Sequence, residues 1–462
     1  MQNDVLEQLR SGRLAGIRRL TLAAGLTEFP REIFELADTL EILDLTGNAL
    51  TALPDDLPRL RNLRILFCSN NQFTELPAVL GQCLSLSMVG FKSNRIVHVP
   101  DDALPPNLRW LILTDNRVEC LPAAIGRCGK LQKLMLAGNR LQALPPELVN
   151  CTRLELLRIS ANRLQALPEW LLSLPRLAWL AYGGNPFCES REKGALEDTT
   201  HAVIPWHQLQ VGEKLGEGAS GFIHRAYWNE GAAACAVAVK LFKGAVTSDG
   251  LPHSEMAACI AGGGHPNLIP VHGKVAGHHA GQDGLVMALV DPRFRTLAGP
   301  PSLDSCTRDV YAAKTQFAPE MALRLALSIA SAIGHLHRRG LMHGDLYAHN
   351  TLYGDTGEAL LGDCGAASFL PIEEPRLAAA LQRLEARAFA CLLEELLERC
   401  AWGTATHAIE QALRHLQAQC AQENAALRPL FAEIVEVLRA QLNQLAGVPD
   451  MPSFACQPSG GA

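Results

Sequence analysis

The sequence predicts a curved solenoid of short repeats followed by a second domain of a different fold class. Two observations support this division. A leucine pattern with one asparagine recurs at nearly constant spacing, and the period stops near Asn185-Pro186. The chain of 462 residues is 48% hydrophobic and 19% charged, so both parts can bury large cores.

The repeated pattern is LxxLxLxxNxLxxLP, and its asparagine recurs in steps of 23, 23, 22, 23, 23 and 23 residues. A degenerate earlier copy starts at Ile17, which makes eight repeats, and Val5, Leu6 and Leu9 predict a capping helix before it. One strand and one turn cannot bury their own leucines, whereas stacked neighbours bury them in a continuous core. The pattern resembles leucine-rich repeats of the short LPxxL type, which implies an α/β solenoid. The asparagines are Asn48, Asn71, Asn94, Asn116, Asn139, Asn162 and Asn185.

The concave strand face is the expected functional surface, because strand residues alternate between the core and the outside. Its two outward columns are Ile42, Ile65, Met88, Trp110, Lys133, Leu156 and Trp179, and Asp44, Phe67, Gly90, Ile112, Met135, Arg158 and Ala181. An exposed apolar face usually marks a binding site. The alternative is that this face packs against the chain's own second domain. The favoured prediction is a protein partner bound through Phe67, Met88, Trp110, Met135, Leu156 and Trp179.

The second half carries motifs suited to phosphate chemistry. Residues 215–223, LGEGASGFI, contain GxGxxG, and a glycine-rich turn lets backbone N–H groups approach phosphates. The run VAVK ends at Lys240, whose amine can pair with the phosphates. Glu255 lies fifteen residues further on and can hold that lysine in place.

A second group of motifs follows a predicted long helix over residues 322–340. His343, Asp345 and Asn350 fit HxDxxxxN, and Asp363 follows within LLGDCG. Asp345 would accept or orient the proton of a nucleophile. Asn350 and Asp363 offer the hard oxygen ligands that Mg²⁺ prefers.

In this order, the motifs make residues 207–443 resemble a protein kinase catalytic domain. The whole chain resembles a leucine-rich-repeat protein kinase of the cytosolic, bacterial-like sort. The resemblance implies an α+β, two-lobed fold with a five-stranded small lobe, ATP and Mg²⁺ as cofactors, and Asp345, Lys240 and Glu255 as catalytic residues. The nucleotide-binding residues it implies are Gly216, Glu217, Gly218, Ala219, Ser220, Gly221, Ile223, Ala238, Lys240, Met287, Leu289 and Leu352.

The motifs also depart from the family pattern. Gly344 replaces the arginine of HRD, Cys364 replaces the phenylalanine of DFG, and no APE follows Asp363. Tyr347 and His349 stand where serine/threonine kinases carry lysine and tyrosine kinases carry arginine. These two positions do not identify the acceptor. The resemblance as a whole implies a protein kinase, most simply of the serine/threonine type. The alternatives are a pseudokinase scaffold and a phosphotransferase for a non-peptide acceptor.

Composition excludes several other classes. The net charge of −6 argues against nucleic acid as a partner, and no apolar run is long enough to span a membrane. None of the 14 cysteines lies in a CxxC pair, and no export signal precedes the repeats, so reduced thiols in the cytoplasm are expected. The expected boundaries are a repeat domain at 1–190, a linker at 191–206, a catalytic domain at 207–443 and a disordered tail at 444–462.

Overall fold

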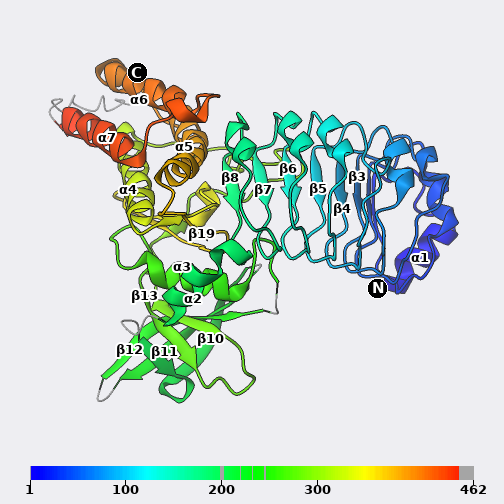
Figure 1. The fold of residues 1–462 in the computed structure, drawn as a ribbon, viewed down its shortest axis with the longest axis horizontal. Coiled ribbons are helices and arrows are strands. Elements are labelled where there is room, and N and C mark those ends of the chain that lie inside the picture. Colours follow the sequence, from blue (N-terminus) through cyan, green and yellow to red (C-terminus); the bar gives the residue numbers. More distant parts are fainter. Residues whose placement is uncertain (1, 198–201, 219, 231–232, 244–245, 447–462) are drawn as a thin grey trace, which may run out of the picture.

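The computed structural model describes residues 2–446 except 198–201, 219, 231–232 and 244–245. The tail predicted to be disordered therefore lies almost wholly outside the described residues. Figure 1 shows a solenoid that begins at the N-terminus and ends against a two-lobed domain, with the small lobe below and the large lobe above.

The solenoid has eight parallel strands in chain order, which confirms the eight predicted repeats. Helix α1 (Gln2–Arg10) covers the open end, as the sequence predicts. Each asparagine ties coils together: Asn71 donates to Leu45 O at 2.9 Å and accepts from the Leu50 amide at 2.9 Å. The strands are β1 (Arg19–Thr21), β2 (Ile42–Asp44), β3 (Ile65–Phe67), β4 (Met88–Gly90), β5 (Trp110–Ile112), β6 (Lys133–Met135), β7 (Leu156–Arg158) and β8 (Trp179–Ala181). The 3₁₀ helices between them are Arg31–Leu36, Leu57–Arg59, Ala78–Gln82, Ala123–Arg127, Pro146–Asn150 and Glu169–Ser173.

The segment expected to be a linker, residues 191–206, contains regular secondary structure. A 3₁₀ turn (Pro186–Cys188) leads into α2 (Glu189–Glu197), and β9 (Ala202–Pro205) follows. The cause is Glu192, which is buried despite the polar sequence around it. Its carboxylate accepts from the Gly184 amide of the last repeat at 2.7 Å and from Ser254 Oγ at 2.8 Å.

The small lobe is a six-stranded sheet with the order β10-β11-β12-β14-β13-β9. The resemblance implied five strands; the additional one is β9, which pairs in parallel with β13. The elements are a 3₁₀ turn (Trp206–Gln208), β10 (Leu209–Glu217), β11 (Gly221–Glu230), β12 (Ala233–Phe242), α3 (Pro252–Gly262), β13 (Val271–Ala276) and β14 (Gly284–Ala288).

The large lobe is mostly helical. The predicted long helix is α4, buried along one face, and α5 packs beside it. The helices are α4 (Pro319–Arg338), α5 (Pro375–Glu398), α6 (His407–Cys420) and α7 (Phe431–Ala446). Short strands and 3₁₀ turns complete it: β15 (Arg295–Thr296), β16 (Leu341–Met342), Ala348–Asn350, β17 (Thr351–Tyr353), β18 (Ala359–Leu361), β19 (Ser368–Phe369), Thr404–Thr406 and Ala425–Leu427. Among the described residues, no helix is both long and apolar enough to span a bilayer.

The last repeats and the large lobe share their hydrophobic cores. The repeat leucines pack in one cluster with Met342, Leu370 and Leu381 of the large lobe. Leu156 and Trp179 of the concave face belong to the core cluster of the large lobe, and Met135 packs against it. Because both clusters cross the boundary, the contact has the character of a core rather than of a loose domain interface.

Trp179 shows what this contact does to the concave face. The indole is only 2% exposed, stacks on Tyr347 with ring centroids 4.3 Å apart, and donates to Leu346 O at 2.9 Å. The expectation that Trp179 and Leu156 face a separate partner is therefore wrong: self-packing covers them. Met88 is also buried, whereas Phe67 and Trp110 remain partly exposed.

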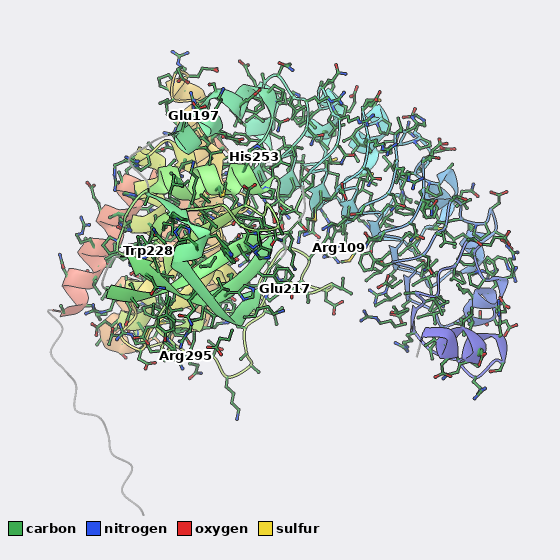
Figure 2. The ribbon with its side chains drawn as sticks, turned by 90° about the horizontal axis from the view of Figure 1, so that it is seen from below. Arg109, Glu197, Glu217, Trp228, His253 and Arg295 are labelled. Atoms are coloured by element: carbon green, nitrogen blue, oxygen red, sulfur yellow. The ribbon has the colours of Figure 1, made fainter. Side chains whose placement is uncertain are left out.

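Two further segments of the second domain lie on the inner side of the solenoid. Arg109, labelled in Figure 2, donates to Asp304 O at 3.4 Å in the segment between β15 and α4. A small-lobe loop, residues 246–251, reaches the repeats, where Lys92 contacts Ser248 at 3.4 Å. Gly138, at φ +72°, admits this loop, because a Cβ there would lie 2.5 Å from Val246 Cγ1. The repeats thus contact both lobes of the second domain.

We predict that Trp179→Ala lowers the free energy of unfolding by about 3–5 kcal/mol, because it leaves a cavity in a shared core. Trp110→Ala is the matched control and should cost much less, since Trp110 is only partly buried. Thermal and urea unfolding of the full chain measure both. Equal, small effects would contradict the shared core.

Candidate active site

Lys240 and Glu255 form a buried ion pair between the sheet and the helix of the small lobe. Lys240 projects from β12 and Glu255 from the first turn of α3. Burial lowers the pKa of Lys240, but the carboxylates of Glu255 and Asp363 outweigh it and hold the pKa above its usual range. Because Ser254 is bonded to Glu192, the end of the solenoid fixes the helix that carries Glu255.

The catalytic loop places Asp345 and Asn350 together, as the motif predicts. Asn350 Nδ2 donates to Asp345 Oδ2 at 2.7 Å and to Asp345 O at 2.9 Å. The amide oxygen of Asn350 is therefore the atom left available for a metal. Asp363 lies nearby at φ +54°, with Oδ1 accepting from the Gly365 amide at 3.1 Å.

A cleft between the lobes contains Lys240, Glu255 and Asp363, whereas Asp345 and Asn350 lie beside it, behind the lining residue Gly362, whose amide donates to Asn350 O at 2.9 Å. It is lined by residues of both lobes: Gly218, Ser220, Gly221, Ile223, Lys240, Glu255, Met287, Leu268, Leu361, Asp363 and Cys364. Of the other expected nucleotide contacts, Gly216, Glu217, Ala238, Leu289 and Leu352 are not among its lining residues, and Ala219 lies outside the described residues.

The cleft suits a magnesium nucleotide. Around Gly216 and Gly218 a Cβ would meet no atom within 4 Å, so the turn is open to a bulky ligand. Among the described residues, the buried Glu255 Oε2 has no hydrogen-bond partner, and it lies near Gly365, where a Cβ would be 3.6 Å from it. A nucleotide and Mg²⁺ would lie between these groups, held by Lys240, Asn350 and Asp363.

Buried polar contacts hold the catalytic loop in shape. His343 Nε2 lies 3.0 Å from Gly362 O, and the Gly344 amide donates to Glu385 Oε1 at 2.6 Å. Burial raises the pKa of Glu385, but the hydrogen bond with His337 at 2.7 Å, the charges of His337 and His343 and the Gly344 amide together outweigh burial and keep the pKa below its usual range. Glu385, on α5, stands where the family usually has aspartate.

Three charged residues at the site were not assigned a role from sequence. Arg158 of β7 binds Asp345 and Asp249, and Lys133 of β6 donates to Cys306 O at 3.3 Å. The signal available was that Arg158 is the one cation in an otherwise largely apolar outward column. Asp249 lies in the small-lobe loop of residues 246–251 and belongs to none of the sequence motifs.

Gly344 replaces the expected arginine because the repeats come too close for a side chain. Its φ is +74°, and a Cβ would lie 2.5 Å from Ala366 O and 2.7 Å from Leu180 O. Leu180 belongs to β8, so the packing of the solenoid against the catalytic loop helps to require glycine at position 344.

The short segment after Asp363 is packed under the last repeat. Ser368 is fully buried and accepts from the Tyr182 amide at 3.1 Å, while Tyr182 donates to Phe369 O at 3.1 Å. Glu373 pairs with Arg191, which follows the last repeat. Arg428 donates to Pro175 O of the repeats at 2.8 Å.

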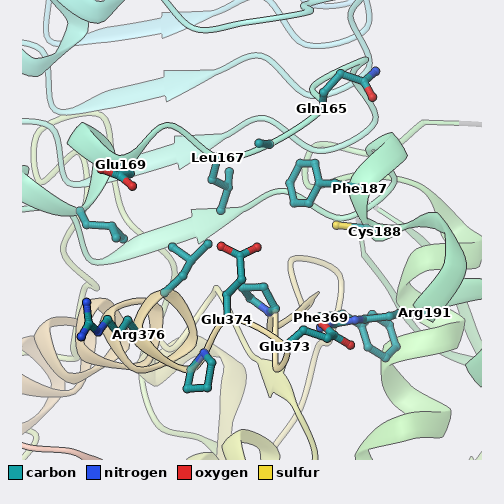
Figure 3. A pocket seen from close by; sticks show the side chains of 15 residues that line it. Gln165, Leu167, Glu169, Phe187, Cys188, Arg191, Phe369, Glu373, Glu374 and Arg376 are labelled. Carbon is teal, nitrogen blue, oxygen red and sulfur yellow. The ribbon is translucent and has the colours of Figure 1, made fainter.

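A second cavity of about 1020 Å³ lies between the last repeat and the start of α5 (Figure 3). Leu167, Phe187 and Phe369 give it an apolar part, and Arg191 and Glu374 add charge. It contains none of the expected phosphate or metal residues, so its size does not make it the catalytic cleft.

Comparison with known proteins identifies the two parts. Residues 209–387 match the family model for protein tyrosine and serine/threonine kinases, and residues 62–83 and 129–187 match leucine-rich-repeat models. The chain is 26% identical over 170 residues to Aurora/IPL1-related protein kinase 2 of Caenorhabditis briggsae, covering 36% of this chain and 50% of that protein. It is 36% identical over 104 residues to leucine-rich repeat-containing protein 58 of Homo sapiens, covering 21% and 28%.

Two other similarities are weaker in extent. The probable inactive serine/threonine-protein kinase roco10 of Dictyostelium discoideum is 32% identical over 114 residues, covering 24% of this chain and 4% of that protein. A leucine-rich-repeat protein of Leptospira interrogans aligns with TM-score 0.37 and 30% identity, covering 40% of this chain and 48% of that one. The chain spans half or less of the length of these proteins. It thus combines leucine-rich repeats with a protein kinase domain.

We predict that Gly344→Ala destabilises the full chain by about 1–3 kcal/mol more than Gly340→Ala, because only the former meets backbone oxygens from both domains. Gly340 is a matched control with the same φ of +74°, where a Cβ would meet only the side-chain atom Ile372 Cγ2, at 3.3 Å, and no backbone atom within 4 Å. Urea unfolding measures the difference. Similar losses in the two variants would contradict close docking at Gly344.

Proposed function

We propose that this chain is an ATP-dependent protein kinase that transfers a phosphoryl group to serine or threonine. The observation that carries the proposal is that the Lys240–Glu255 pair and Asp363 line one interlobe cleft. The Asp345–Asn350 pair adjoins this cleft through Gly362, a lining residue whose amide donates to Asn350 O at 2.9 Å. Relatives described as serine/threonine-protein kinases support the acceptor type.

Each residue has a defined task under this proposal. Lys240 orients the phosphates, and Glu255 holds Lys240. Asn350 and Asp363 hold Mg²⁺, which would neutralise developing charge on the phosphates. Asp345 accepts the proton of the acceptor hydroxyl. The hydroxyl oxygen bonds to the γ-phosphorus as the bond between that phosphorus and the bridging oxygen breaks, and ADP leaves.

Two alternatives bear on the assay. A pseudokinase scaffold would bind its ligands without transferring a phosphoryl group. Against this alternative, the chain retains every residue of the proposed machinery: Lys240, Glu255, Asp345, Asn350 and Asp363. A non-peptide acceptor is favoured by one observation: the repeats cover the segment after Asp363, where Ser368 is buried. Assays should therefore include small hydroxyl acceptors beside Ser, Thr and Tyr peptides.

We also propose that the uncovered part of the concave face recruits a protein partner. Ile42, Phe67, Trp110 and Ile112 are partly exposed there, and Phe67 and Ile112 flank Gly90. The absence of a side chain at Gly90 leaves room for the Phe67 ring, since a Cβ would lie 2.6 Å from Phe67 Cδ1. An apolar surface of this kind suits an apolar segment of another protein.

We expect Lys240→Met to abolish transfer of label from radiolabelled Mg-ATP while the chain still folds, with a lowered melting temperature because Glu255 loses its buried partner. The lost amine no longer orients the phosphates. Lys193→Met is the matched control, because Lys193 is exposed on α2. Transfer by the Lys240 variant at the wild-type rate would rule out the proposed role.

We expect a photo-crosslinking residue at position 67 to capture a protein partner in cells, because that position lies on the uncovered concave surface. The same residue at position 84, an exposed site outside the strands, should not. Mass spectrometry of the adducts identifies the partner. Equal capture at both positions, or none at position 67, would contradict recruitment through this surface.

A further inference from the structure

Arg158 lies in the middle of the contact between the solenoid and the catalytic loop. Its side chain is 2% exposed, and each terminal group has a partner in the kinase domain. Nε donates to Asp249 Oδ1 at 2.7 Å, Nη1 donates to Gly344 O at 3.0 Å, and Nη2 donates to Asp345 Oδ1. Burying a guanidinium is costly unless its charge and donors are matched in this way.

The catalytic loop has no permanent cation of its own. Residues 343–350, HGDLYAHN, contain neither lysine nor arginine. His349 lies in this loop, but its ring is already bonded to Asp309 at 2.7 Å. The permanent charge facing Asp345 therefore comes from the repeat domain, through Arg158 and, further away, Lys133.

The contact that carries Arg158 is not a detachable lid. Neighbouring residues of β7 and β8, Leu156 and Trp179, lie inside the core cluster of the large lobe. Releasing the arginine would expose this core, at a cost that a transient movement cannot meet. Arg158 is thus a permanent component of the site rather than a removable cap.

We propose that Arg158 is a positioning residue for phosphoryl transfer, which holds the Asp345 carboxylate in place beside Asn350. The proposal rests on the proposed kinase activity. Arg158 engages Oδ1 and Asn350 engages Oδ2, yet each carboxylate oxygen keeps a second lone pair for an acceptor hydroxyl. The Asp345 side chain remains 17% exposed, so an acceptor can reach it.

The charges around Asp345 agree with this role. Burial raises the pKa of Asp345, but Arg158, His349, His343 and Asn350 together outweigh it, and the pKa lies below its usual range. The charged or titratable groups that face Asp345 are Arg158, Lys133, Asp249, His343, Tyr347 and His349.

The test compares the full chain with Arg158→Ala, Arg158→Lys and the control Arg163→Ala, an exposed arginine of the same repeat. We expect Arg158→Ala to lower kcat by about 10²-fold, with KM for Mg-ATP changed by no more than about twofold. Arg158→Lys should restore part of kcat, and Arg163→Ala should behave as wild type.

A second variant separates positioning from folding. Arg158→Met combined with Asp249→Asn removes a buried charge from each side, so it avoids leaving Asp249 unpaired, and it should fold yet keep the low kcat. Higher kcat in Arg158→Ala would show that the guanidinium blocks the site, and unchanged kcat would show that it is only a structural contact. Either result overturns this proposal while leaving the proposed function standing. A wild-type chain without transfer to any acceptor would overturn the proposed function together with it.

Discussion

Burial of the last two repeat strands against the catalytic loop is the constraint on which the rest of this structure depends. Trp179 stacks on Tyr347, and Arg158 binds Asp345, so the last strands of the solenoid pack directly on the catalytic loop. The contact also reaches the small lobe through Asp249 and through Glu192. The repeats therefore set the relation between the lobes as well as the surroundings of Asp345.

This constraint explains why the catalytic loop departs from the pattern of related kinases. Gly344 has no side chain because Leu180 O lies where a Cβ would need space. Tyr347 stands where related kinases carry a cation, because its ring stacks on Trp179 in the buried interface. Ser368 is held by a backbone amide of the last repeat, which leaves no accessible hydroxyl for switching by phosphorylation. Taken one at a time, these substitutions resemble the loss of kinase motif residues. Together they are explained by the packing of the repeat domain against the catalytic loop.

Much of the fold could be predicted, because local periodicity determines it. The spacing of Asn48 through Asn185 predicted eight stacked strands, and the motifs predicted that Lys240 and Glu255 would lie close to Asp363. Docking could not be predicted, because an outward apolar column has the same pattern whether a partner or the chain's own domain covers it. Trp179 was assigned wrongly for that reason. Arg158 was visible in the column, but its role depends on Asp345, which lies 187 positions further along the chain.

The central claim is that the repeats and the kinase domain form one cooperative structure. Differential scanning calorimetry of the full chain, with and without Mg-ATP, tests it most directly. The shared cores predict one transition whose calorimetric and van't Hoff enthalpies agree, and which shifts upward as a whole when nucleotide binds the cleft. Two separate transitions, of which Mg-ATP shifts only one, would contradict the claim.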